Sequence, residues 1–248
     1  LLFNKTVEIG IKVNTQKKIS YLENFLNLLL SLLVRRKIKN QFGGNLIAFV
    51  SGGGPLDSQI GNTLNALGIK TLQGYGLTET SPVVSCNPLT NIKVETVGPA
   101  LPNVEVKLAD DGEILVRGEV LMIGYWNNNE ATSKIIKHGW LYTGDIGKFD
   151  SDNYLIITDR KKDIIVSSGG DNISPSKLEN LLTLDSKIEQ ACVFGDNKSY
   201  ISALLVINSQ ENPNKNEIQN YINNLNLSLS QPEKIKRFKI IEIPFSME

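Results

Sequence analysis

The most regular apolar spacing lies near the start of the chain. Between residues 20 and 42 it predicts one helix with a single apolar stripe, formed by Leu22, Phe25, Leu26, Leu29, Leu32 and Leu33. We expect this stripe to pack in a core, with the basic run at residues 35–39 near the carboxyl end of the helix. An interfacial membrane surface or an acyl-binding surface is the alternative. The run is far shorter than the roughly 20 apolar residues that a spanning helix needs.

A different pattern follows between residues 46 and 76. Residues 46–50 predict a short buried strand that leads into the glycine-rich turn of residues 51–55, and a helix is predicted over residues 57–67. A second strand over residues 69–72 ends in a second glycine-rich turn, residues 74–76. This succession is typical of a parallel α/β layer, in which ligand sites lie at the carboxyl ends of the strands.

From residue 96 the apolar positions recur with period two. Residues 104–108 and 113–117 flank a polar turn and predict a hairpin, and β character continues through residues 140–142 and 154–158. A small antiparallel subdomain is therefore predicted over residues 96–160. Together with the αβ layer of residues 1–95, it forms a predicted larger domain over residues 1–160.

The remaining residues, 161–248, predict a small α+β domain. Its helices are expected to begin at Ser174-Pro175 and near residue 216. Its strands are expected over residues 163–166, 190–194, 201–207 and 238–243. The fold class is therefore α/β, with a parallel αβ layer, an antiparallel β subdomain and an α+β C-terminal domain.

The composition argues against nucleic-acid binding, a zinc site and a disulfide framework. Acidic and basic residues balance at 26 each, so no net charge draws the chain to nucleic acid. Cys86 and Cys192 are the only cysteines and His138 the only histidine, which favours two buried thiols in a reducing cytoplasm over zinc or a disulfide. His138 is expected on the surface. The residues at the start do not have the pattern of a signal peptide, so a cytoplasmic location is expected.

Two motifs carry candidate chemistry. The turn of residues 51–56, SGGGPL, lets backbone approach a flat or charged ligand, although alone it is also an ordinary turn. In residues 73–80, QGYGLTET, the ring of Tyr75 can lie on a nucleobase and the hydroxyl of Thr78 can bind a phosphate oxygen. Glu79 is a hard oxygen ligand suited to Mg²⁺.

These motifs resemble those of the AMP-forming acyl-CoA synthetase and ligase superfamily. GYGLTET at residues 74–80 is similar to a core motif of that family, and SGGGPL precedes it at the expected distance. Four more similar segments follow in the family's order, at residues 112–118, 124–126, 140–147 and 159–179. The chain resembles the long-chain fatty acid ligases most at residues 72–88, 189–206 and 240–248.

The resemblance implies a nucleotide site. Gly53, Gly54 and Tyr75 would form the adenine pocket, Thr78 would hold phosphate, and Glu79 would hold Mg²⁺. The family pattern further implies that Asp145 accepts hydrogen bonds from the ribose hydroxyls and that Arg160 binds the ribose or a phosphate. On local evidence alone, Asp145 is a turn residue and Arg160 part of a solvated charge cluster.

A second group of roles belongs to coenzyme A transfer. Lys162 matches the hinge about which the C-terminal domain of these enzymes rotates, so that domain is expected to be mobile. Gly169 and Gly170 would line the channel for the pantetheine arm. Asp171 departs mildly from the family, where Glu or Lys is usual.

The implied reaction joins a carboxylic acid, expected to be a long-chain fatty acid, to coenzyme A with ATP and Mg²⁺, releasing AMP and pyrophosphate. The family's phosphate loop and catalytic lysine do not occur in residues 1–248, so the chain alone is expected not to complete adenylation. Another acyl- or aryl-adenylating ligase, transfer to a carrier protein and an inactive nucleotide-binding module are the alternatives. Peripheral membrane contact is left open.

Overall fold

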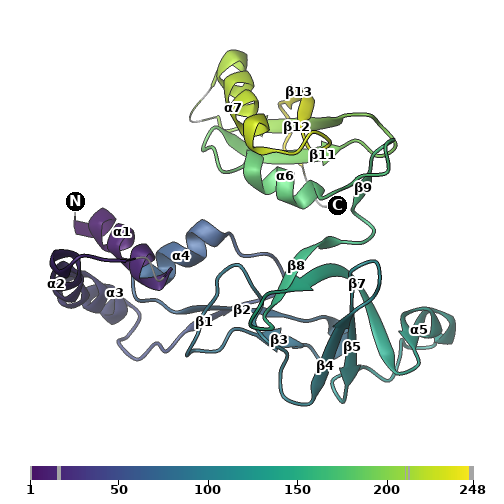
Figure 1. Ribbon diagram of the computed structural model, residues 1–248, viewed down its shortest axis with the longest axis horizontal. Helices are drawn as coiled ribbons and strands as arrows, with labels where there is room; N and C mark the ends of the chain where they lie inside the picture. Colours follow the sequence, from purple (N-terminus) through teal and green to yellow (C-terminus); the bar gives the residue numbers. More distant parts are fainter. Residues whose placement is uncertain (1, 16–17, 210, 212, 246–248) are drawn as a thin grey trace. The chain divides into compact units, whose positions relative to one another are not determined.

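The computed structural model describes residues 2–15, 18–209, 211 and 213–245 (Figure 1). Its internal contacts divide the chain into two compact units, one of Leu1–Thr143 with Gly147–Ile157 and the other of Gly144–Ile146 with Thr158–Glu248. The domain limits predicted from the sequence stay a prediction. Residues 246–248, which belong to a segment of the resemblance, lie outside the described residues.

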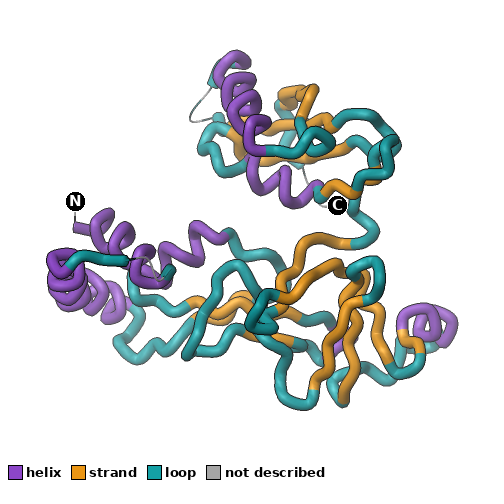
Figure 2. The backbone as a smooth tube through the Cα atoms, in the orientation of Figure 1, coloured by secondary structure: helices purple, strands orange, loops and turns teal. Residues whose placement is uncertain are grey.

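Helices form one end of the first unit (Figure 2). They are α1 (Leu2–Asn14), α2 (Tyr21–Leu30), the π-helical η1 (Ser31–Arg35), α3 (Arg36–Gln41) and α4 (Ser58–Ala66). Ser20 begins α2 with a capping box, because its hydroxyl accepts from Glu23 N while the Glu23 carboxylate accepts from Ser20 N. The helix predicted over residues 20–42 is thus confirmed, with one π-helical segment inside it.

The prediction that the apolar stripe packs in a core is wrong for the described chain. Leu22 is 76% exposed and Leu32 58%, whereas Leu30, which borders the stripe, is 1% exposed. The Arg35 guanidinium connects this helix to α4 by donating to Ala66 O at 2.7 Å, and it also donates to Asn27 O within the same helix at 3.2 Å. The helix packs against α1, with Leu30 inward, and most of the stripe remains exposed.

A small sheet connects these helices to the rest of the unit. Strand β1 (Phe49–Ser51) pairs in parallel with β2 (Thr71–Tyr75), and β3 (Ser85–Cys86) pairs antiparallel with β2. The side chain of Asp57 caps α4 between β1 and β2 by accepting from Ile60 N. The predicted parallel pair is confirmed, although both strands begin later than the sequence suggested. The prediction that the first strand is buried is wrong, because Phe49 is 40% and Val50 70% exposed.

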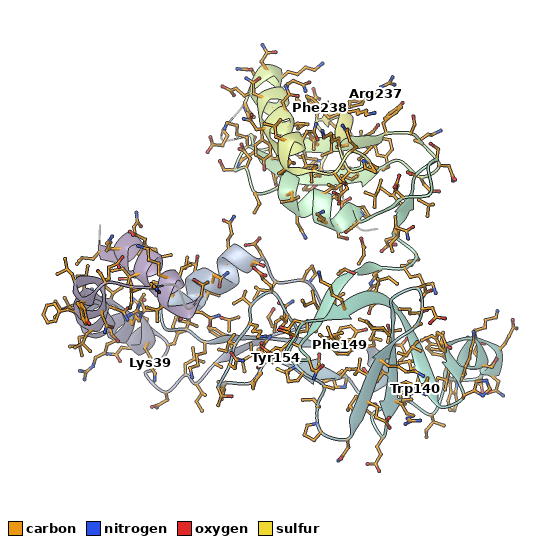
Figure 3. The ribbon with its side chains drawn as sticks, in the orientation of Figure 1. Lys39, Trp140, Phe149, Tyr154, Arg237 and Phe238 are labelled. Atoms are coloured by element: carbon orange, nitrogen blue, oxygen red, sulfur yellow. The ribbon has the colours of Figure 1, made fainter. Side chains whose placement is uncertain are left out.

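The antiparallel subdomain has five strands: β4 (Val104–Leu108), β5 (Glu113–Gly118), β6 (Ile136–Lys137), β7 (Trp140–Phe149) and β8 (Leu155–Arg160). Their order is β4-β5-β7-β6, with β8 on β7, and the predicted hairpin is confirmed by the pairing of Val106 with Val116. Helix α5 (Asn129–Ile135) precedes β6. Trp140 lies on β7 (Figure 3). Lys107 Nζ lies 4.1 Å and the Arg117 guanidinium carbon 4.6 Å from the centroid of its ring.

The second unit is α+β, as predicted. It contains β9 (Ile165–Val166), β10 (Asn172–Ile173), α6 (Pro175–Leu182), β11 (Ile188–Phe194), β12 (Ile201–Ile207), α7 (Lys215–Ser228) and β13 (Ile235–Ile241). Strand β12 pairs antiparallel with β11 and in parallel with β13. Both helices and the three strands of this sheet, β11, β12 and β13, contribute to one hydrophobic core. It includes Leu178, Leu182, Ile201, Leu205, Ile218, Ile222 and Ile235.

The two cysteines are half-buried rather than fully buried, and both thiols are free. Burial raises the pKa of each thiol above its ordinary value. A raised pKa means a smaller thiolate fraction at neutral pH. Reactive cysteines have a lowered pKa instead, so neither thiol has this mark of a reactive cysteine. His138 lies exposed in a turn with a φ of 52°, as predicted.

Candidate functional site

The two glycine-rich turns meet at one edge of the small sheet. Ser51 lies opposite Gln73 in the parallel register, so β1 and β2 leave the sheet side by side at their carboxyl ends. A Cβ on Gly52 would lie 3.6 Å from Gly74 O, which confirms that the turns are neighbours. A Cβ on Gly53 or Gly54 would have no heavy atom within 4 Å. This edge therefore offers bare backbone and open space, as a flat ligand requires.

The turn that follows β2 is tightly built. A Cβ on Gly76 would lie 1.6 Å from Pro82 O, so only glycine fits there. Leu77 N donates to the Thr80 hydroxyl, which is buried, and the single 3₁₀ turn η2 (Thr78–Thr80) results. Thr78 is exposed and Glu79 half-buried on this turn. The sequence thus holds a hydroxyl and a carboxylate in fixed positions directly after a parallel strand.

Tyr75 has a different environment from the one that the sequence suggested. Its side chain is 7% exposed and belongs to the hydrophobic cluster that contains Val84, Val97 and Leu155. A ring that stacks on a base needs one accessible face. The stacking role of Tyr75 stays a prediction.

The Glu79 carboxylate has a partner that the sequence analysis did not assign. The Tyr125 hydroxyl donates to Glu79 Oε1 at 2.6 Å, and Met122 N donates to Glu79 O at 2.9 Å. The pKa of Tyr125 is raised, mainly by its hydrogen bond to Glu79 and secondly by burial. Tyr125 belongs to the Gly124-Tyr125-Trp126 segment, which supported the resemblance, but no local pattern linked it to Glu79.

In the second unit, Asp145 and Arg160 lie together. Arg160 Nε is 3.4 Å from Asp145 Oδ1, where the chain segments of β7 and β8 run side by side. Asp145 is 5% exposed and lies within strand β7, so it is not the turn residue that its local sequence allows. Lys161 N also donates to Gly144 O at 2.8 Å. That Asp145 and Arg160 share one nucleotide with Glu79 stays a prediction.

The residues predicted for coenzyme A transfer are exposed. Lys162 lies in a turn that is closed by Asp163 N and Ile164 N, both of which donate to Arg160 O. In the loop after β9, the Ser167 hydroxyl donates to Asp171 Oδ2 and accepts from Gly169 N. The hinge role of Lys162 and the channel role of Gly169 and Gly170 stay predictions.

The donor set of the site fits one kind of metal binding. Among the residues that the structure describes, no three His, Cys, Asp or Glu side chains are grouped to hold a metal ion. Mg²⁺ does not require such a cage, because it is usually held by one or two carboxylates with substrate phosphates and water. The single carboxylate of Glu79 fits that mode. Over the described part of the chain, no helix combines the length and apolar character needed to cross a membrane.

Two models of known protein families match the chain. The family model for AMP-binding enzymes matches residues 16–126, which include both glycine-rich turns and the Glu79–Tyr125 pair. The model for the C-terminal domain of AMP-binding enzymes matches residues 162–247. The chain belongs to the AMP-binding enzyme family. The two models leave residues 127–161 between them, and these include Asp145 and Arg160.

Within the AMP-binding enzyme family, the chain is similar to bacterial fatty acid ligases. It is 39% identical over 236 residues to a long-chain-fatty-acid–CoA ligase from Mycobacterium bovis, covering 86% of this chain and 39% of the relative. It is 36% identical over 183 residues to a long-chain-fatty-acid–CoA ligase from Salmonella typhimurium, covering 68% of this chain and 32% of the relative. The chain therefore spans about two fifths or less of the length of these relatives.

A solved AMP-binding enzyme has the same fold. The o-succinylbenzoate coenzyme A synthetase from Bacillus subtilis, in complex with AMP, superposes with a TM-score of 0.69 at 28% identity. The match covers 79% of this chain and 42% of the synthetase. The same synthetase in complex with ATP and a magnesium ion matches equally well. The α/β fold predicted from the sequence is thereby confirmed.

Proposed function

We propose that this chain is part of a long-chain fatty acid–CoA ligase and contributes its adenine-nucleotide site and its coenzyme A-transfer domain. The observation that carries the proposal is the paired glycine-rich edge of β1 and β2, followed directly by the turn that presents Thr78 and Glu79. The 39% identity to a long-chain-fatty-acid–CoA ligase supports a fatty acid as the substrate. An aromatic acid is less well supported, because the o-succinylbenzoate synthetase is 28% identical.

In the proposed reaction, a fatty acid carboxylate attacks the α-phosphorus of ATP and pyrophosphate leaves. The thiol of coenzyme A then attacks the acyl carbonyl carbon, and AMP leaves. The open backbone at Gly53 and Gly54 would admit the adenine ring. The Thr78 hydroxyl would bind a phosphate oxygen, and Glu79 would hold Mg²⁺, which neutralises charge on the departing pyrophosphate.

Asp145 and Arg160 would bind the ribose. A carboxylate that a protein fixes in place can accept from both ribose hydroxyls, and the exposed Arg160 guanidinium would add donors toward the ribose or a phosphate. Lys162 would be the hinge for the second half-reaction. Gly169 and Gly170 would then leave room for the pantetheine arm, because neither carries a side chain.

Nucleotide binding tests the proposal directly. We expect the chain to bind ATP·Mg²⁺ and AMP in calorimetric titrations, and to bind GTP at least tenfold more weakly. ATP–pyrophosphate exchange is expected only from a longer protein that also carries the family's phosphate loop and lysine, with long-chain fatty acids preferred over benzoate. Equal affinity for ATP and GTP, or no binding of either, would contradict the proposal.

A further inference from the structure

Tyr125 reaches the turn of Glu79 from a remote part of the chain. The two residues are 46 positions apart, and the hydroxyl-to-carboxylate distance is 2.6 Å. The neighbouring Met122 N donates to Glu79 O, so the loop that carries Tyr125 is bound to the same turn through its backbone as well. Side chain and backbone of Glu79 are therefore both held by one segment.

The backbone of Tyr125 is itself held in place. Tyr125 N donates to Thr132 Oγ1 at 2.9 Å, and the Thr132 hydroxyl donates to Asn128 O at 3.0 Å. The Asn128 side chain caps α5 by accepting from Ala131 N. A Cβ on Gly124 would lie 3.0 Å from two atoms of the Thr132 side chain, so the loop lies tightly against the helix. These contacts connect the tyrosine to a regular element.

A carboxylate has two oxygens, each of which can accept a hydrogen bond or bind a metal ion. The Tyr125 hydroxyl engages Oε1, and no described residue donates to Oε2. A hydrogen bond to one oxygen limits rotation of the carboxylate and leaves the other oxygen in a set direction. Partners of this kind orient metal-binding carboxylates in many proteins.

We infer that Tyr125 is a positioning residue for Glu79: it holds Oε1 so that Oε2 is presented to the metal of a bound Mg²⁺·ATP. The inference rests on the proposed function, because it requires a metal–nucleotide complex at Glu79. It adds to that function a role for a residue that touches neither nucleotide nor metal. Tyr125 is 38% exposed, so a large part of its surface is available to solvent and its removal leaves no sealed cavity.

The test measures binding rather than catalysis. Tyr125→Phe removes only the hydroxyl, and calorimetric titration with unmodified ATP reports affinity with Mg²⁺ and with EDTA. We expect the affinity gain on adding Mg²⁺ to fall about 10-fold or more, within the range for lost partners of metal ligands. Affinity in EDTA should stay within about twofold, which a general loss of structure would not allow.

Two further variants keep the inference testable if Tyr125→Phe is unstable. Thr132→Val removes the acceptor of Tyr125 N and should reduce the Mg²⁺-dependent gain in part, while Thr132→Ser retains the hydroxyl and should resemble the wild type. Tyr21→Phe is the matched control, because Tyr21 is 98% exposed. Circular dichroism and the thermal midpoint check that each variant is folded.

The outcomes separate the two claims. A wild-type chain that binds ATP no better with Mg²⁺ than with EDTA overturns the metal role of Glu79, and with it the proposed function. If the wild type gains affinity with Mg²⁺ and Tyr125→Phe gains equally, the positioning role alone is overturned. A loss of affinity in EDTA equal to that in Mg²⁺ also counts against it.

Discussion

The carboxylate of Asp145 is almost completely buried, while the guanidinium of its partner Arg160 lies largely in solvent. Arg160 Nε is 3.4 Å from Asp145 Oδ1, and the side chains are 58% and 7% exposed. A buried carboxylate beside an arginine has a fixed position. Under the proposed function, the Asp145 carboxylate accepts hydrogen bonds from the ribose hydroxyls, and the Arg160 guanidinium donates to the ribose or a phosphate.

Asp145→Asn should weaken ATP and AMP binding about 10- to 100-fold, because a hydrogen bond to a charged group contributes about 1.5–3 kcal/mol. Calorimetric titration of the folded variant measures this. Glu105→Gln is the matched control, since it removes a carboxylate from an exposed pair with Arg117 and should leave nucleotide affinity unchanged. Unaltered binding by Asp145→Asn would refute its ribose role.

The glycines of the two turns should respond differently to a methyl group. Gly54→Ala meets no atom within 4 Å and no unfavourable φ, so the free energy of unfolding should stay within about 1 kcal/mol of the wild type. Nucleotide affinity should fall nonetheless, because the methyl group would occupy the space proposed for adenine. Urea unfolding and nucleotide titration on the same sample separate the two effects.

Gly76→Ala, unlike Gly54→Ala, should clearly lower the stability of the fold. Its Cβ would lie 1.6 Å from a backbone oxygen, that of Pro82, so the turn must move. We expect the free energy of unfolding to fall by at least about 2 kcal/mol, as for other overpacked sites. A Gly76→Ala protein as stable as Gly54→Ala would show that the turn has another conformation in solution.

The two faces of the helix over residues 20–42 differ in exposure, and leucine substitutions should reveal it. Leu30→Ala removes a side chain that is 1% exposed and should lower the free energy of unfolding by about 2–5 kcal/mol. Leu32→Ala, at 58% exposure, should change it by less than about 0.5 kcal/mol. Equal losses would show that the leucine stripe is buried in solution.

Glu179 should make the stability of the second unit depend on pH. Burial is the main cause that raises the pKa of its carboxyl, and the charges of Asp159 and Asp163 raise it further. A raised pKa means that the fold favours the protonated form. The related stability is therefore fully present below the unfolded pKa and is lost as the pH rises through the folded pKa.

Glu179→Gln imitates the protonated form while keeping an oxygen that can accept from Val193 N. The variant should be more stable than the wild type at pH 7, and the difference should vanish below about pH 4. Urea unfolding at several pH values measures the difference. Glu179→Ala serves as the control, since loss of the acceptor for Val193 N should destabilise the unit at every pH.

Much of the local structure followed from the sequence alone. Period-two and period-3.6 spacing predicted the hairpin and most of the helices, and Ser174-Pro175 marked the beginning of α6. The glycine-rich turns and their place after parallel strands were also predictable. These features depend on residues that are near neighbours along the chain, so their energetics are contained in a short segment.

The tertiary structure decided the features that depend on contacts between remote segments. It left most of the leucine stripe exposed, packed the Tyr75 ring into a core and joined Tyr125 to Glu79. Periodicity states that a helix has an apolar face, but not which partner will lie against it. Burial and long-range hydrogen bonds are determined only when the whole chain has folded, because each depends on which other segment packs against the residue.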